Sequence, residues 1–124
     1  MMVRVLVVDG SAAVSVRLAA RLREACHDVV GIAGSAEAAL EQARALLPDV
    51  IVVDPQLPDC AGLEVIAALK VRAPVAVVVV LSSDPQPRYR THCQAHGADY
   101  FFDKASEFDA VATTLAVAAA RSGR

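Results

Sequence analysis

The stretch VIVVDPQLP at residues 50–58 decides the fold of this chain. Its first four residues are apolar, as expected for a short strand that is buried in the sheet. Asp54 follows that strand directly. In an open parallel sheet, ligands bind just beyond the carboxyl ends of the strands, so a carboxylate at this position is available for chemistry rather than for packing.

Four further apolar runs of strand length accompany residues 50–53, and segments with helical periodicity lie between them. The runs are 3–8, 29–33, 75–81 and 98–102. The β and α periods alternate five times, which implies parallel strands, right-handed crossovers and helices on both faces. We therefore predict an α/β fold, a doubly wound five-stranded parallel sheet in a three-layer arrangement.

The helices are predicted from their caps and from their apolar positions. Ser11 caps a helix over 12–26, Ser35 caps one over 36–47, and a third covers 63–71. Pro85 and Pro87 open a fourth, Gly97 closes it as the C′ residue, and Ser106 caps a fifth. The inward-facing residues are predicted to be Val14, Leu18, Leu22, Ala25, Leu40, Ala43, Leu47, Phe108, Val111, Leu115 and Ala119.

Composition limits the function. The 124 residues fit one domain, and we expect residues 1–124 to form it. The net charge is -2 and the 12 Lys and Arg residues are scattered, which argues against direct binding of nucleic acid. The most apolar segment, 75–81, is too short to span a bilayer, so we expect a cytoplasmic protein without membrane contact.

Three charged side chains stand at the ends of predicted strands. Asp9 follows the first, Asp54 the third and Lys104 the fifth. Each alone is as easily explained as a turn former, a cap or a solvated lysine. Together they favour a site, because the carboxyl ends of parallel strands meet at one edge of the sheet.

At this point the sequence resembles the receiver domain of bacterial two-component response regulators, and the architecture is that of the single-domain, chemotaxis-type regulator. The resemblance covers essentially the whole chain. It rests on Val7-Val8-Asp9, on Asp54-Pro55-Gln56-Leu57-Pro58 with Gly62, on Ser82 at the fourth strand end, and on residues 97–104, GADYFFDK. It implies a flavodoxin-like (βα)5 fold with strand order 2-1-3-4-5.

The resemblance also implies a reaction. Asp54 would accept a phosphoryl group from a sensor histidine kinase or a histidine phosphotransfer protein, with help from Lys104 and Ser82. Mg²⁺ would be held by Asp9, Asp54 and the Gln56 backbone carbonyl. Such a domain is a signalling module rather than an enzyme, catalysing at most its own phosphorylation and dephosphorylation.

The same resemblance implies how the signal leaves the domain. Ser82 would move on phosphorylation, and Phe101 would turn inward with it. This changes the face made by the fourth helix, the fifth strand and the fifth helix, where a downstream protein would bind. A homodimer through that face is left open.

Gly10 departs from the family pattern, which has a second acid after Asp9. Its absence weakens the expected magnesium site. A second interpretation is therefore a pseudo-receiver, an interaction module that works without phosphorylation. A nucleotide-binding enzyme is disfavoured, because no GxGxxG or GxxxxGK[ST] loop follows the first strand.

Overall fold

The computed structural model describes residues 2–61, 63–84 and 86–121 and has the predicted architecture. A five-stranded parallel sheet has the order β2-β1-β3-β6-β7, which is the 2-1-3-4-5 order of a doubly wound fold. Its strands are β1 (Arg4–Val8), β2 (Asp28–Ala33), β3 (Val50–Val53), β6 (Val77–Ser82) and β7 (Tyr100–Asp103). The helices are α1 (Ala12–Glu24), α2 (Ala36–Leu46), α3 (Glu64–Arg72), α4 (Pro87–Ala95) and α5 (Ala110–Arg121).

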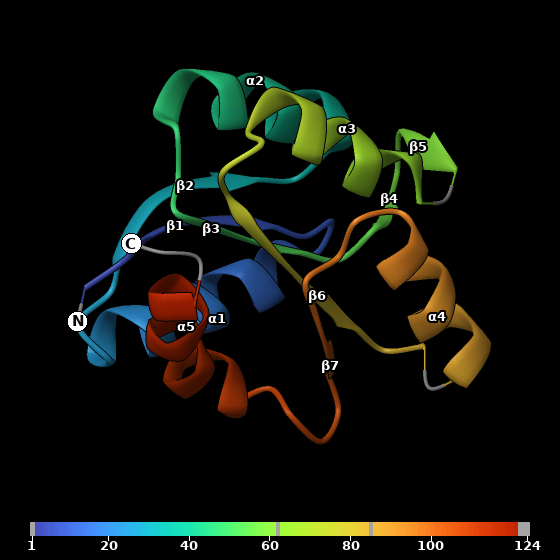
Figure 1. Cartoon of the computed structure of the whole chain (residues 1–124). Coiled ribbons are helices and arrows are strands. Elements are labelled where there is room, and N and C mark those ends of the chain that lie inside the picture. The colour runs from blue at the N-terminus through green and yellow to red at the C-terminus, as the bar shows by residue number, and fades with distance from the viewer. Residues whose placement is uncertain (1, 62, 85, 122–124) are drawn as a thin grey trace.

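Side chains alternate along the strands and so fill two separate cores. Leu6, Ile51 and Val78 point to the face covered by α2, α3 and α4, which we term the α2/α3/α4 core. Val7, Val52 and Val79 point to the opposite face, the α1/α5 core. Figure 1 shows α2 and α3 on one side of the sheet and α1 and α5 on the other. The three-layer prediction is confirmed.

The register of the sheet brings the charged strand ends together. Val8 pairs with Val53, so the residues that follow them, Asp9 and Asp54, leave the sheet side by side. On the other side of β3, Ser82 pairs with Asp103, and Lys104 comes next. The loops that follow β1, β3, β6 and β7 therefore all begin at the same edge of the sheet.

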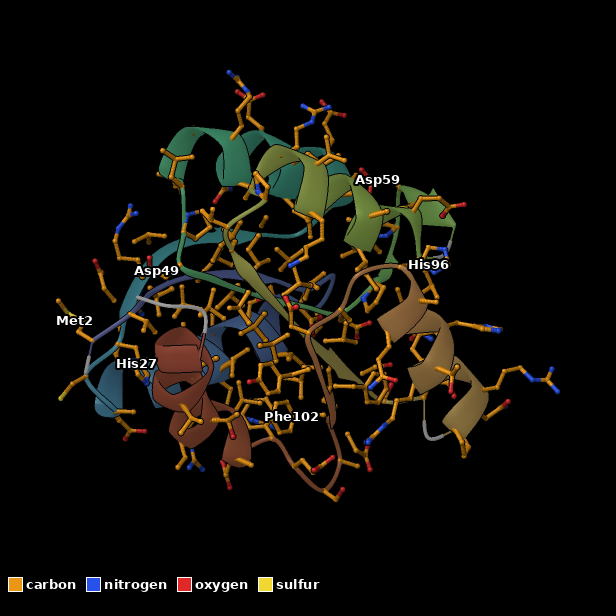
Figure 2. The ribbon with its side chains drawn as sticks, in the orientation of Figure 1. Met2, His27, Asp49, Asp59, His96 and Phe102 are labelled. Atoms are coloured by element: carbon orange, nitrogen blue, oxygen red, sulfur yellow. The ribbon has the colours of Figure 1, made fainter. Side chains whose placement is uncertain are left out.

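A short antiparallel pair of strands follows β3 and was not predicted. It consists of β4 (Gln56–Leu57) and β5 (Cys60–Ala61). Both Asp59 carboxylate oxygens accept hydrogen bonds from the α2 N-terminus, at 2.7 Å from Ala36 N and 3.0 Å from Glu37 N. Figure 2 shows Asp59 beside the ends of α2 and α3. Gly62, which the family motif includes, lies outside the described residues.

Several predicted boundaries and facing residues differ from the structure. The helix predicted over 12–26 ends at Glu24, and Ala25 is exposed because it is the C-cap residue. The prediction that Leu47 faces inward is wrong. It is the left-handed C-cap of α2 (φ 49°), which turns the chain away from the helix face and leaves its side chain 66% exposed. Val75 is also exposed, because β6 begins only at Val77.

The last two helices show one correct and one incorrect cap prediction. Pro87 begins α4, and Gly97 closes it with φ 114°, as predicted. The prediction that Ser106 caps the fifth helix is wrong, because the Ser106 hydroxyl bonds Asp103 Oδ2 at 2.9 Å and α5 begins only at Ala110. Phe108, Val111 and Leu115 are buried as predicted. Pro85 and the Ala119 side chain are not among the described parts.

No helix within the described residues is long and apolar enough to cross a membrane. The apolar strand β6 is buried along its whole length between β3 and β7.

Candidate functional site

Lys104 joins the two carboxylates at the carboxyl edge of the sheet. Its Nζ lies 2.7 Å from Asp54 Oδ2 and 2.8 Å from Asp9 Oδ2. The Asp54 and Asp9 side chains are 8% and 6% exposed, and that of Lys104 is 17% exposed. The sequence predicted that these three residues converge, and the structure brings them into direct contact. The contact between Lys104 and Asp9 was not predicted.

Backbone N–H groups hold the second oxygen of each carboxylate. Ser11 N donates to Asp9 Oδ1 at 2.8 Å, and Gln56 N donates to Asp54 Oδ1 at 3.0 Å. Both bonds reach two residues ahead, which is the Asx-turn geometry favoured by aspartate in turns. Each carboxylate is therefore fixed in orientation by a rigid strand end and by its own turn.

The Lys104 ammonium remains charged although it is partly buried. Burial alone disfavours the charged form, but the hydrogen bonds and charges of Asp54 and Asp9 outweigh it and raise the pKa of Lys104. A cation paired with two carboxylates leaves one net negative charge at this edge of the sheet.

The oxygen atoms at this edge fit a hard divalent cation. Two carboxylates and a backbone carbonyl are ligands that Mg²⁺ accepts, with water completing its octahedral shell. The Gln56 carbonyl oxygen would lie 3.7 Å from a Cβ at Gly10, so it belongs to the same corner as Asp9. Within the described residues, no cluster of three or more His, Cys, Asp or Glu side chains suits a metal ion. Such an ion would compete with Lys104 for the two carboxylates.

Ser82 is the last residue of β6 and is fully buried beside the site. Its backbone carbonyl accepts a hydrogen bond from Lys104 N at 2.8 Å, which ties it to the lysine loop. Its hydroxyl oxygen accepts one from Asp84 N at 3.1 Å. The Ser82 side chain therefore bonds the β6–α4 loop rather than the carboxylates.

Phe101 belongs to β7, and its ring packs against α4. The ring lies edge-on against Tyr89, with centroids 6.1 Å apart, and the Arg90 guanidinium lies 5.0 Å from its centre. Arg90 also approaches Glu107 Oε1 at 4.0 Å. Phe101 and Arg90 line a pocket of about 410 Å³ between the start of α4 and the β7–α5 loop.

Sequence reasoning missed the α4 residues that contact Phe101. Tyr89 precedes the buried Cys93 by four residues, so helical periodicity already placed the two on one face of α4. The contacts of Arg90 with Phe101 and Glu107 link residues far apart in sequence, and no local pattern indicates them.

Sequence comparison matches residues 5–116 to the family model described as the response regulator receiver domain. The chain is 32% identical over 114 residues to the transcriptional regulatory protein MctR of Rhizobium johnstonii, covering 91% of this chain and 53% of that protein. It is 43% identical over 81 residues to protein-glutamate methylesterase/protein-glutamine glutaminase 5 of Anaeromyxobacter dehalogenans, covering 64% of this chain and 22% of that enzyme. The chain thus spans about half of the first relative and about a fifth of the second.

Solved structures agree with the sequence match. The signal receiver domain of NarL from Mycobacterium tuberculosis superposes with a TM-score of 0.86 at 29% identity, covering 95% of this chain and 96% of that one. The response regulator domain of Thermotoga maritima CheB gives a TM-score of 0.77 at 29% identity, covering 98% and 96%. In both, almost the whole of this chain is matched.

Proposed function

The chain belongs to the receiver-domain family of response regulators, and on this premise we propose that it accepts a phosphoryl group on Asp54. The observation that carries the proposal is the Asp54 carboxylate, which is buried at a strand end and bonded to Lys104 at 2.7 Å with Asp9 alongside. A carboxylate held in this way is oriented for attack and lies next to a cation that can stabilise transferred charge.

The proposed reaction is phosphoryl transfer from a phosphohistidine. An Asp54 oxygen attacks phosphorus, the O–P bond forms, the P–N bond breaks, and the imidazole nitrogen keeps the electron pair and takes up a proton. Lys104 pairs with the phosphoryl oxygens once they carry the negative charge, because its ammonium already lies within bonding distance of Asp54. Ser82 supplies a hydroxyl from the neighbouring strand end.

Asp9, Asp54 and the Gln56 carbonyl would hold magnesium. When bound, Mg²⁺ neutralises charge on the carboxylate and phosphoryl oxygens. The two backbone N–H bonds fix one oxygen of each carboxylate, and the other oxygen, which contacts Lys104 in this structure, would be the one available to the metal ion.

The proposed signal leaves through α4, β7 and α5. Ser82, Phe101 and the loop to α5 are adjacent parts of this region, and Phe101 forms part of a pocket on it. We expect the donor to be a sensor histidine kinase or a histidine phosphotransfer protein, and the receiver of the signal to be a protein that contacts this face or a second copy of the chain. We propose residues 1–124 as a single receiver domain with no direct nucleic-acid contact.

One experiment tests phosphoryl transfer directly. The protein is incubated with acetyl phosphate at millimolar Mg²⁺, and its intact mass is measured. We expect one added phosphoryl group on the wild type, none on Asp54→Asn, and one on Asp49→Asn, which changes an aspartate just before the other end of the same strand. An unmodified wild-type protein would contradict the proposal.

A second candidate function is the phosphorylation-independent pseudo-receiver. It is favoured by Lys104, which pairs with both carboxylates, and by Gly10, which supplies no second acid. In that case the lysine acts as a permanent internal counter-ion and the output face is constitutive. Absence of the phosphoryl adduct, with partner binding unchanged in Asp54→Asn, would support this second function.

A further inference from the structure

The Tyr89 hydroxyl is buried and has no hydrogen-bond partner in the part of the chain that the structure describes. Buried hydroxyl groups usually have a hydrogen-bond partner. An unpaired one has lost its hydrogen bonds to water and gained none in the protein, which destabilises the folded state. Phenylalanine would pack in this position without that cost. An unpaired tyrosine therefore suggests a partner that is present in another state of the protein.

The surroundings of Tyr89 point to the phosphorylation site. Burial raises the pKa of Tyr89 to about 12, and Cys93 and then Asp54 push it in the same direction, while the Ser82 hydroxyl opposes the shift. The phenol therefore lies close to Ser82 and to the Cys93 thiol without making a well-formed hydrogen bond to either. Its ring packs edge-on against Phe101 at an interplanar angle of 77°. One side chain of α4 thus lies next to both residues of the proposed switch.

The Ser82 hydroxyl has the capacity to receive another bond. A serine hydroxyl has one donor and two acceptor positions, and Asp84 N occupies one acceptor at 3.1 Å. When the Ser82 hydroxyl donates a hydrogen bond to an anionic phosphoryl oxygen, its own oxygen becomes a stronger acceptor, since hydrogen bonds in a chain polarise one another.

We propose that Tyr89 is a positioning residue of the switch, whose hydroxyl donates a hydrogen bond to Ser82 Oγ once Ser82 contacts the phosphoryl group on Asp54. The new bond favours the phosphorylated arrangement, because the unphosphorylated one leaves the phenol unpaired. The same movement shifts the ring against Phe101 and so couples Ser82 to the output face. This inference rests on the proposed function.

The test uses beryllofluoride with Mg²⁺, an unreactive mimic of the phosphoryl group on aspartate. Tyr89→Phe removes only the hydroxyl, and we expect its affinity for beryllofluoride to fall on the order of tenfold. Tyr100→Phe is the matched control, because it removes a hydroxyl from β7 on the α1/α5 side, and it should stay close to the wild type. The unphosphorylated Tyr89→Phe protein should melt no lower than the wild type.

A spectroscopic readout separates positioning from packing. The sequence has two tyrosines and no tryptophan, so Tyr100→Phe leaves Tyr89 as the only strong near-ultraviolet fluorophore. In that variant, beryllofluoride should red-shift the tyrosine absorption band and change its emission, as expected when a phenol begins to donate a hydrogen bond.

The outcomes distinguish the two proposals. A wild-type protein that takes up neither phosphoryl group nor beryllofluoride contradicts the proposed function and this inference with it. If the wild type responds, but Tyr89→Phe binds beryllofluoride equally well and the Tyr89 spectrum is unchanged, only the inference is wrong. Equal destabilisation of both forms by Tyr89→Phe would indicate a packing role and would also overturn it.

Discussion

Lys104 is the cation that two buried carboxylates share, and this arrangement determines how the site responds to other cations. Asp9 and Asp54 each give one oxygen to Lys104 and the other to a backbone N–H. Any further cation must therefore displace Lys104 from these carboxylate oxygens or share the oxygens with it. At residue scale, the competition between Lys104 and a metal ion depends on how much negative charge lies near Gly10.

Replacing Gly10 with aspartate should tighten magnesium binding. A Cβ at this position would approach Pro58 at 3.5 Å and the Gln56 carbonyl at 3.7 Å, which are ordinary contacts. A unit charge about 4 Å from the ion is worth roughly 1 to 4 kcal/mol between bulk water and the protein surface, so we expect at least about a fivefold fall in the Mg²⁺ dissociation constant. Isothermal titration of Mg²⁺ into Gly10→Asp and into the wild type measures the two dissociation constants.

Gly10→Asn is the control for this change, because it has nearly the same volume without the charge. It should bind Mg²⁺ little better than the wild type. Equal gains in Gly10→Asp and Gly10→Asn would mean that charge at this corner does not control the ion.

At the scale of the elements, the sequence predicted the strands better than it predicted their connections. Buried runs such as 50–53 carry their own signal, because a strand covered on both faces must be apolar throughout. The β4–β5 pair has only two residues in each strand, so it leaves little pattern in the sequence. Asp59, between the two strands, bonds the start of α2, and this contact spans 23 residues. The cap predicted at Ser106 failed for a local reason, because the Ser106 hydroxyl donates to Asp103, three residues earlier, instead of capping α5.

Asp59 should stabilise α2 in a pH-dependent way. Hydrogen bonds from Ala36 N and then Glu37 N lower the pKa of Asp59 below its ordinary 3.8. A lowered folded-state pKa means that this stabilisation is present above about pH 3.8 and is lost as pH falls through the folded value. Asp59→Asn should therefore melt a few degrees below the wild type at pH 7, and the difference should shrink toward pH 3.

Circular dichroism melts at several pH values measure the Asp59 effect. Glu41→Gln, a change on the exposed side of the same helix, is the control and should differ little from the wild type at any pH. A difference for Asp59→Asn that stays constant from pH 7 to pH 3 would contradict the capping role of the carboxylate.

Arg90 should hold Phe101 in its present position. Its guanidinium lies 5.0 Å from the ring centre and is about half exposed, and a cation–π contact of this kind is worth roughly 0.5–1 kcal/mol. If Phe101 must leave this contact when the switch turns, Arg90→Met should strengthen beryllofluoride binding by about two- to fivefold. Arg88→Met, on an exposed position of the same helix, should leave it unchanged. Weaker binding in Arg90→Met would contradict this restraining role.

At the scale of the whole molecule, the sheet separates two cores that one chain must fill at the same time. The strand residues alternate between the α2/α3/α4 core and the α1/α5 core, and this period-two pattern is hidden in the sequence because both sets are apolar. Which valine faces which core could not be predicted from runs such as 75–81. The family resemblance supplied the strand order, and the strand order then brings Asp9, Asp54 and Lys104 together.

Adjacent valines of β6 allow the two cores to be tested against each other. Val78 packs in the α2/α3/α4 core and Val79 in the α1/α5 core, and both are fully buried. Each change to alanine removes two methyl groups, so each should cost about 2–3 kcal/mol of unfolding free energy. Because the two side chains point to opposite faces, the double variant should lose nearly the sum.

Urea denaturation followed by circular dichroism and by tyrosine fluorescence measures both variants. If the sheet makes the two cores one cooperative unit, the two signals should give the same midpoint in every variant, with an unchanged dependence on urea. Val78→Ala would then weaken α5 as much as α4, although α5 lies on the opposite face of the sheet. Separate midpoints, with each valine affecting only its own core, would show instead that the faces unfold independently.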